Sequence, residues 1–219
     1  MLKAAQAISA RRFGRDGLRL IINKRLPLAS GMGGGSADAA ATLRLLHRLN
    51  GGGNDRGLPA IAARLGADVP MCLVSEPLRA QGTGERIERI AGIPALALVL
   101  VNPGEALPTA KVFQGLRHTD DRPLPAMPAR GFGSVFELVI WLRQTANSLE
   151  APAQAEAKVI KRVVAALRED PDCLFARMTG SGPTCFGIFA SPAAAQRAAI
   201  RLRVGRPEWW IAPCVTGAS

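Results

Sequence analysis

A glycine-rich stretch near the start of this 219-residue sequence has the residue types of a phosphate site. Residues 27–37 read P-L-A-S-G-M-G-G-G-S-A and lead directly into a helix-forming sequence. Glycine has no Cβ to obstruct a ligand, and a helix start presents free N–H groups and the positive end of the helix dipole. The stretch is neither a Walker A loop nor a G-x-G-x-x-G dinucleotide loop. A flexible glycine-rich connector is the alternative.

A carboxylate, Asp68, is the second candidate, in the string G-A-D-V-P-M-C-L-V that begins at Gly66. We expect Asp68 in a turn between a helix and an apolar strand. A carboxylate beside a phosphate site can accept the proton of an attacking hydroxyl, as in other phosphoryl transfers. In the alternative interpretation Asp68 only caps the turn, as most loop aspartates do.

Two further sets of residues could contact a ligand. Thr109 and Phe113 lie one helical turn apart, so a hydroxyl and a ring could share one helix face; an N-cap threonine with a core phenylalanine is the alternative. Gly180 and Gly182 frame Ser181 between two strand-like runs. A plain hairpin turn explains these glycines, but such a turn can also present N–H groups to an anion.

These segments resemble those of the GHMP small-molecule kinases. The stretch P-L-A-S-G-M-G-G-G-S-A-D-A-A is similar to their phosphate-binding motif, in the triple-glycine form of members that act on 4-diphosphocytidyl-2-C-methyl-D-erythritol. The strings G-A-D-V-P from Gly66, A-Q-G-T-G-E from Ala80 and M-T-G-S-G-P-T from Met178 resemble further family motifs. The resemblance covers nearly all of the chain.

The resemblance implies a kinase that uses ATP and magnesium to phosphorylate the 2-hydroxyl of this cytidine-diphosphate polyol in non-mevalonate isoprenoid synthesis. Asp68 would be the general base, and Ser36 would help to hold magnesium. Thr109, Phe113 and the turn of Gly180, Ser181 and Gly182 would contact the substrate. The residues implied to bind ATP are Pro27, Leu28, Ala29, Ser30, Gly31, Met32, Gly33, Gly34, Gly35, Ser36 and Ala37.

The sequence also departs from the family pattern. Ala37 replaces a serine, Ser148 replaces an acid in the string N-S-L-E, and Pro183 replaces an alanine and so removes one N–H donor. Another GHMP kinase, for homoserine or mevalonate, and a catalytically inactive binding protein are the alternatives in function.

The family's glycine loop follows a longer N-terminal segment, which carries a catalytic lysine in a K-x-N-L-type motif. Here Pro27 comes almost at once, and Lys3 lies in a sequence that predicts a helix. We therefore expect an incomplete first domain with an exposed sheet edge and a partly uncovered core, weak ATP binding and weaker catalysis. A misassigned start codon and a deliberate fragment both remain open.

Composition limits the classes of partner. The net charge of +11, from 28 Lys and Arg against 17 Asp and Glu, favours an anionic partner, and a polyanionic small substrate fits. Scattered arginines, no tyrosine and few aromatics argue against a nucleic-acid-binding module. No apolar run approaches the roughly 20 residues that span a bilayer. We expect a cytoplasmic monomer or weak homodimer with no membrane contact.

The four cysteines show no pairing pattern. They lack a C-x-x-C motif and nearby paired histidines, which argues against a metal site or a disulfide framework. Two of them lie in apolar runs that we interpret as strands, where a reduced, buried thiol is usual. The cysteines are Cys72, Cys173, Cys185 and Cys214, and the two in apolar runs are Cys72 and Cys185.

The elements that must position these residues follow from hydrophobic periodicity and from turn residues. We predict an α+β, two-domain GHMP kinase fold: residues 1–92 as a truncated α/β nucleotide-binding domain like ribosomal protein domain 2, and residues 93–219 as a ferredoxin-like domain. Helices are expected over residues 2–13, 58–65, 132–145, 152–167 and 192–202 and after the glycine loop and Pro108. Strands are expected over residues 18–24, 78–81, 87–90, 95–101, 174–178, 184–189 and 209–215.

Overall fold

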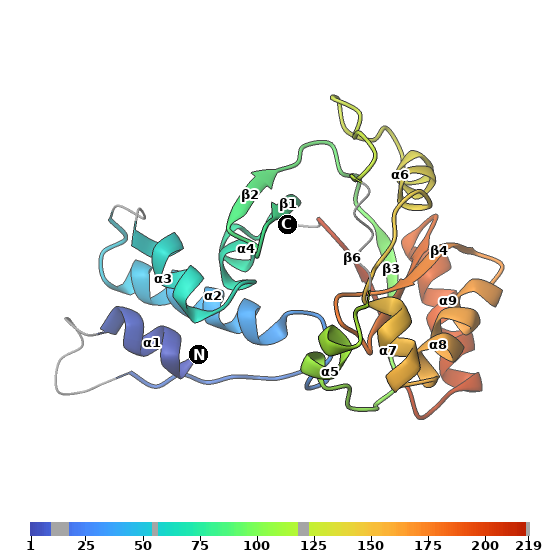
Figure 1. The fold of residues 1–219 in the computed structure, drawn as a ribbon, viewed down its shortest axis with the longest axis horizontal. Coiled ribbons are helices and arrows are strands. Elements are labelled where there is room, and N and C mark those ends of the chain that lie inside the picture. The colour runs from blue at the N-terminus through green and yellow to red at the C-terminus, as the bar shows by residue number, and fades with distance from the viewer. Residues whose placement is uncertain (10–17, 54–56, 118–122, 218–219) are drawn as a thin grey trace. The chain divides into compact units, whose positions relative to one another are not determined.

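The chain folds into two compact units (Figure 1). The computed structural model describes residues 1–9, 18–53, 57–117 and 123–217. The first unit comprises Met1–Arg25 and Gly33–Ile90, and the second comprises Leu26–Met32 and Ala91–Ser219. The glycine loop is divided between these two units. The first half of the glycine loop belongs with the second unit, and the second half with the first.

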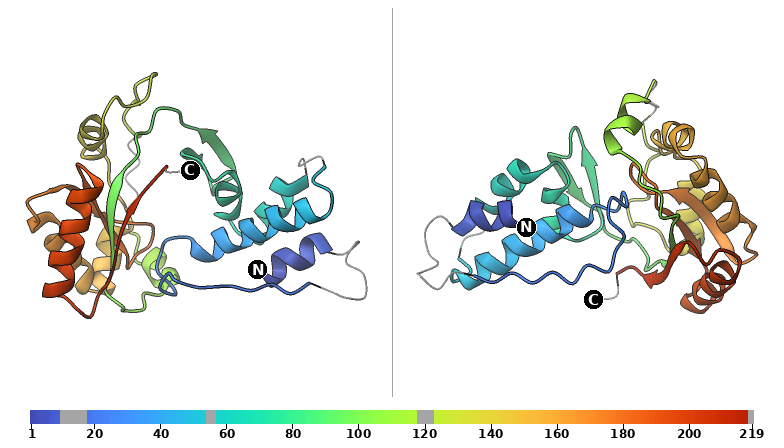
Figure 2. Two further views of the ribbon diagram at one scale, coloured as in Figure 1. Left: turned by 180° about the vertical axis from the view of Figure 1, so that it is seen from behind. Right: turned by 90° about the horizontal axis from the view of Figure 1, so that it is seen from below.

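The first unit consists mainly of helices packed on a small core. Its helices are α1 (Leu2–Ser9), α2 (Gly34–Leu49), α3 (Leu58–Leu65) and α4 (Val69–Val74). Alanines and leucines recur on one face of α2, so this face is buried against the neighbouring helices, and α1 lies alongside α2 (Figures 1 and 2). The buried core of this unit contains Ala4, Ala39, Ala40, Leu43, Ala62 and Val69.

A hairpin completes the first unit. Strands β1 (Leu78–Gln81) and β2 (Arg86–Arg89) pair antiparallel, with Leu78 opposite Arg89. The turn between them contains Gly82 and Gly84, both at positive φ. This confirms the hairpin that the alternating sequence and its glycines predict.

Three predictions for the first unit need correction or restriction. Residues 18–24 do not form a strand, because no described neighbour pairs with their N–H and C=O groups, and alternation alone supplies no partner. The apolar run around Cys72 is helix α4, not a strand. A short apolar run is ambiguous in period, and Pro70 suits the first turn of a helix. The helix expected over residues 2–13 is seen as Leu2–Ser9, and residues 10–13 lie outside the described part.

The second unit is built on a four-stranded antiparallel sheet in the order β4-β5-β3-β6. The strands are β3 (Ala97–Asn102), β4 (Cys173–Met178), β5 (Cys185–Phe189) and β6 (Trp210–Val215). Helices α8 (Val159–Glu169) and α9 (Pro192–Gly205) pack on the same side of this sheet (Figures 1 and 2). The sequence of elements β3-α8-β4-β5-α9-β6 confirms the ferredoxin-like prediction.

Shorter helices complete the second unit. These are α5 (Thr109–Gln114), α6 (Val135–Leu142) and α7 (Glu150–Glu156). The single helix predicted over residues 152–167 is two helices, because Ala157 at the end of α7 is extended, with φ −136° and ψ 94°. This break lets α7 and α8 run in different directions and gives α8 its own buried face.

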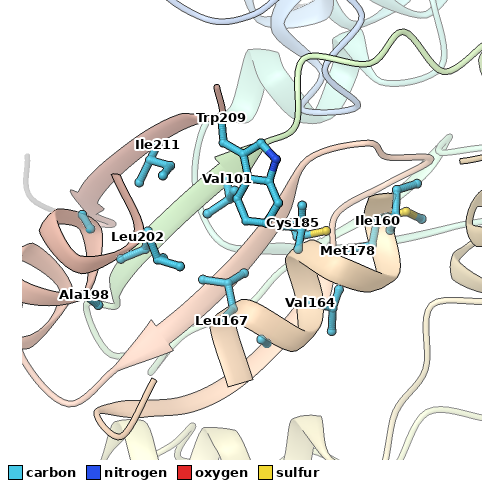
Figure 3. Close-up of a cluster of buried hydrophobic side chains, with 14 of the residues drawn as sticks. Val101, Ile160, Val164, Leu167, Met178, Cys185, Ala198, Leu202, Trp209 and Ile211 are labelled. Atoms are coloured by element: carbon cyan, nitrogen blue, oxygen red, sulfur yellow. The ribbon is translucent and has the colours of Figure 1, made fainter. Parts of the chain in front are cut away.

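The core of the second unit lies between the sheet and its two helices. In Figure 3, Leu167 of α8 and Leu202 of α9 lie against the strand residues Val101 and Cys185. Burial raises the pKa of the Cys185 thiol to about 12. All four cysteines are free thiols, as the sequence predicts. No helix among the described residues is long and apolar enough to cross a membrane.

Candidate active site

The N-terminus of α2 is open and has no side-chain cap. Gly33 occupies the cap position in the left-handed region, with φ 65° and ψ 17°, a conformation that glycine adopts at little cost. The first helical bond runs from Ala37 N to Gly33 O at 2.9 Å. The N–H groups of Gly34, Gly35 and Ser36 therefore have no helical carbonyl to pair with. They form the kind of N–H cluster that binds phosphate.

There is free space beside these N–H groups. A Cβ placed on Gly33 or Gly35 would meet no atom within 4 Å. The protein's own packing therefore does not require glycine at residue 35, where φ is also ordinary. A ligand that approaches the backbone closely would require it.

Two polar side chains lie near this helix start. Ser36 is the third residue of α2, because Gly33 takes the cap position. Asp38 lies beyond the first turn and forms an ion pair with Lys24 at 2.8 Å. The first turn of α2 therefore carries no negative charge that would repel an anion.

Asp68 stands directly before helix α4 and its carboxylate is exposed. It occupies the N-cap position but makes no capping bond with its side chain. In the described part of the chain the carboxylate has neither a hydrogen-bond nor an ion-pair partner. The capping role that we left open is therefore not seen, and both oxygens are available to accept a proton.

Helix α4 is fixed to α2 by an arginine. Arg44 of α2 donates through Nη1 to the carbonyl oxygens of Cys72 at 2.8 Å and Leu73 at 3.2 Å, near the end of α4. Val69, next to Asp68, is buried in the core shared by these helices. Burial, followed by the negative charge of Asp68, raises the pKa of the Cys72 thiol. Asp68 and the phosphate-site N–H groups thus stand on two helices that pack together.

The hairpin turn supports the segment that holds Asp68. Gly84 has φ 104°, and a Cβ there would lie 2.9 Å from the carbonyl oxygen of Ala67. In the same turn the Glu85 carboxylate accepts from Thr83 N at 2.6 Å and from Thr83 Oγ1 at 2.9 Å. We infer a structural role for this turn.

In the second unit, the other half of the glycine loop contacts the glycine-framed turn. A Cβ on Gly31 would overlap the carbonyl group of Gly182, and one on Gly180 would lie 2.6 Å from Gly31 O. Thr184 N also donates to Ser30 O at 3.4 Å. These backbones can approach so closely only because the contacting residues are glycines.

Thr109 and Ser181 come together, although 72 positions separate them in the sequence. Their hydroxyl oxygens, Oγ1 and Oγ, lie 3.2 Å apart. Pro108 takes the cap position of α5, and Phe113, one turn after Thr109, is 54% exposed. The alternative of a capping threonine with a core phenylalanine is therefore wrong in both parts.

Sequence reasoning underrated the residues that hold the glycine-framed turn in place. Asn147 donates through Nδ2 to Met178 O at 3.1 Å and to Gly180 O at 2.9 Å, and its Oδ1 accepts from Leu149 N at 3.0 Å. Glu150 Oε2 accepts from Met178 N at 3.1 Å. The string N-S-L-E, which contains Asn147 and Glu150, was the available signal.

Comparisons with known proteins identify the family of this chain. The sequence pattern of the GHMP kinases N terminal domain matches residues 1–76, and that of the GHMP kinases C terminal domain matches residues 135–203. The chain is 48% identical over 216 residues to 4-diphosphocytidyl-2-C-methyl-D-erythritol kinase of Dinoroseobacter shibae. That alignment covers 98% of this chain and 71% of the relative.

Solved structures give the same result. A crystal structure of 4-(cytidine 5'-diphospho)-2C-methyl-D-erythritol kinase superposes with a TM-score of 0.77 at 32% identity, covering 99% of this chain and 78% of that one. Homoserine kinase from Cytophaga hutchinsonii, with a TM-score of 0.63 and 19% identity over 88% of this chain and 70% of its own, shares the fold. The predicted α+β GHMP kinase fold is thereby confirmed. The chain belongs to the 4-diphosphocytidyl-2-C-methyl-D-erythritol kinases of the GHMP kinase family.

Proposed function

We propose that this chain transfers the γ-phosphoryl group of ATP to the 2-hydroxyl of 4-diphosphocytidyl-2-C-methyl-D-erythritol, a step of non-mevalonate isoprenoid synthesis. Membership of the GHMP kinases implies the use of ATP. Two observations together carry the proposal. Helix α2 has an uncapped, open N-terminus. Asp68 stands at the start of α4, which packs against α2, and its carboxylate bonds to no other described group. Arg44 ties the helices that bear them.

The proposed roles follow from these positions. The N–H groups of Gly34, Gly35 and Ser36 would bind the phosphate oxygens and stabilise the charge that develops on them during transfer. Asp68 would accept the proton of the 2-hydroxyl while that oxygen forms its bond to the γ-phosphorus and the bond to the bridging oxygen breaks, leaving ADP. A carboxylate with no competing partner suits this role.

Magnesium is part of the proposal. The Ser36 hydroxyl would be one of its ligands, and the described residues contain no cluster of three or more His, Cys, Asp or Glu side chains that could hold the ion alone. That fits magnesium, which is usually bound by few protein oxygens together with phosphates and water. When bound, the ion would neutralise charge on the phosphates.

The acceptor substrate would be bound by residues of the second unit. The adjacent hydroxyls of Thr109 and Ser181 offer hydrogen bonds to a polyol or a phosphate. The exposed ring of Phe113 could stack on cytosine. Gly180 and Gly182 would keep the backbone of the turn accessible. A cytoplasmic location and a monomeric or weakly dimeric state stay predictions.

Substitution of Gly35 tests the nucleotide site. Because a Cβ at residue 35 would meet no atom of the surrounding structure within 4 Å, Gly35→Val should fold normally but obstruct the phosphates. We expect ATP affinity, measured by isothermal titration calorimetry, to fall at least about tenfold, which is about 1.4 kcal/mol.

Gly53→Val is the matched control. Gly53 also has an ordinary φ and open space, but it lies beyond the end of α2. Equal ATP affinities of the Gly35→Val and Gly53→Val variants would contradict the proposed site.

A further inference from the structure

A second basic feature lies away from the residues assigned above, at the edge strand β4. A cavity of about 400 Å³ opens there in the second unit. Strand β4 is the terminal strand of the sheet order, so one side of its backbone has no neighbouring strand. Three arginines line the cavity: Arg143, Arg168 and Arg177, the last of which belongs to β4. Four other β4 residues complete the lining: Cys173, Leu174, Phe175 and Ala176.

Two of the arginines are held by the free edge of the strand. Arg143, which follows α6, donates through Nη2 to Leu174 O at 3.1 Å. Arg168, near the end of α8, donates through Nη2 to Ala176 O at 3.2 Å. Each of these hydrogen bonds uses one of the five N–H donors of its guanidinium group. Several donors of both guanidinium groups therefore remain for a ligand.

The third arginine is fixed more firmly. Arg177 donates through Nη1 to Thr145 Oγ1 and through Nη2 to Leu142 O, each at 2.9 Å. Its guanidinium also stacks on the ring of Phe175, with Cζ 4.7 Å from the ring centroid. These contacts orient the side chain before any ligand arrives, which lowers the entropic cost of binding.

The positive charge of this cluster is not neutralised by contact with an acid. Every hydrogen-bond partner of the three arginines is an uncharged oxygen, and none of them forms an ion pair with a carboxylate of the described residues. Burial lowers the pKa of Arg177; the charge of Glu150 opposes this, and the positive charge of Arg168 adds to it. Arg168 and Arg177 are thus close enough to repel each other.

Edge protection explains part of this arrangement. Charged side chains over edge carbonyls discourage pairing with another chain, and Arg143 and Arg168 do cover alternate carbonyls of β4. Protection does not account for three guanidinium groups around one cavity. Guanidinium groups gathered around one cavity, with no carboxylate of the described residues in contact with them, suit a phosphate, which arginine binds with its planar fork.

We propose that the β4-edge cavity binds a small molecule carrying a di- or triphosphate group, at a site separate from the glycine loop. The volume suits a small ligand, and three guanidinium groups match several phosphate charges. A nucleic-acid strand fits less well. Among the described residues, Phe175 is the only aromatic residue that lines the cavity, and Arg177 already covers its ring, so bases find no stacking surface.

Inorganic pyrophosphate is the probe for the first test. We would titrate it into the chain and into the Arg143→Gln/Arg168→Gln variant, whose glutamine amides can still donate to the β4 carbonyls. Arg162→Gln is the matched control, because Arg162 is an exposed arginine of α8 outside the cavity. We expect the double variant to bind pyrophosphate at the cavity at least tenfold more weakly and the control to bind it like the unmodified chain.

The Gly35→Val variant separates this site from the nucleotide site. It should keep the pyrophosphate binding that the double variant loses, whether or not the glycine loop binds ATP. Pyrophosphate binding that is unchanged in the double variant would overturn the proposal. If the double variant does lose pyrophosphate binding, titrations with ADP and with an alkyl diphosphate distinguish a nucleotide from another diphosphate ester as the ligand.

Protection of the unmodified chain provides a measurement that depends on no variant. Phenylglyoxal modifies accessible arginines, and peptide mass spectrometry locates the modified residues. Pyrophosphate should slow modification of Arg143 and Arg168 but not of Arg162. Equal modification of all three with and without pyrophosphate would contradict the site. Protection by single-stranded RNA but not by pyrophosphate would replace it with a nucleic-acid contact.

Discussion

Single residues determine where two glycine-rich segments of this chain can meet. Gly31 and Gly182 both have positive φ, at 69° and 75°, and their backbones are in contact. The sequence pattern predicts that residues 27–37 contain glycines because a bound phosphate must approach the backbone closely. The structure adds a second reason for Gly31, which is the space taken by Gly182.

Gly31→Ala should therefore destabilise the protein. The added Cβ overlaps the Gly182 carbonyl and also strains a left-handed backbone, so we expect the free energy of unfolding to fall by about 2 kcal/mol or more. Urea unfolding followed by circular dichroism measures this.

Gly104→Ala separates the two causes. Gly104 also has a positive φ, 80°, but a Cβ there meets nothing within 4 Å. Its cost should be about 1 kcal/mol, from the backbone alone. Equal losses in the two variants would show that the Gly31–Gly182 contact does not matter.

At the scale of elements, the turn after β4 depends on Asn147, which precedes α7, and on Glu150, the first residue of α7. Asn147 binds the carbonyls of Met178 and Gly180, and Glu150 binds the N–H of Met178. Ser181, whose hydroxyl contacts that of Thr109, is carried by this turn. Asn147 is therefore a positioning residue for the proposed acceptor site.

Asn147→Asp should disturb this turn with almost no change in volume. The new carboxylate cannot donate to the two carbonyls and faces them with a negative charge, so we expect a loss of about 2 kcal/mol in stability. In a kinase assay the KM for the cytidine-diphosphate substrate should rise while ATP affinity stays unchanged.

Ser148→Ala is the control for this prediction. Ser148 is exposed, and its side chain forms no hydrogen bond with the described residues. If Asn147→Asp lowered ATP affinity and left the KM for the acceptor unchanged, the turn would belong to the nucleotide site.

At the scale of the whole molecule, most helices and strands could be predicted from the sequence, but contacts between residues far apart in the chain could not. The hairpin, α3 and the strands of the ferredoxin-like sheet were predicted because their periods and bounding glycines are local signals. Residues 18–24 failed as a strand because pairing needs a partner. The grouping of Leu26–Met32 with the second unit depends on contact with Gly182, which local pattern does not encode.

The candidate site shows the same limit. The motifs located the N-terminus of α2, Asp68, Thr109 and Ser181, and the hydroxyls of the last two do meet. Sequence could not show that Asp68 has no partner among the residues that the structure describes, since that depends on every neighbour. The β4-edge arginines were also unforeseen, because they come from separate elements and form no sequence motif.

Buried thiols make a whole-chain prediction about alkaline stability. Burial raises the pKa of Cys185 to about 12 and that of Cys173 to about 11, above the ordinary thiol value of 9.0. Between these values the unfolded chain loses thiol protons that the folded chain retains. The free energy of unfolding should therefore fall as the pH rises above 9.

The Cys185→Ala variant isolates this effect from the titration of other groups. Its stability, followed by urea unfolding from pH 8 to pH 10.5, should fall less steeply than that of the unmodified chain. Identical slopes of stability against pH in the two proteins would mean that burial does not keep the Cys185 thiol protonated above pH 9.

The most direct test of the kinase proposal follows the phosphoryl group itself. ATP labelled in its γ-phosphate is incubated with magnesium, 4-diphosphocytidyl-2-C-methyl-D-erythritol and either the chain or its Asp68→Asn variant, and ATP binding is measured for both. We predict labelled product with the chain, at least about a hundredfold slower labelling with Asp68→Asn, and equal ATP affinity. An unchanged rate in the variant would remove Asp68 as the base. ATP binding without any labelled product from the chain would contradict the proposed reaction.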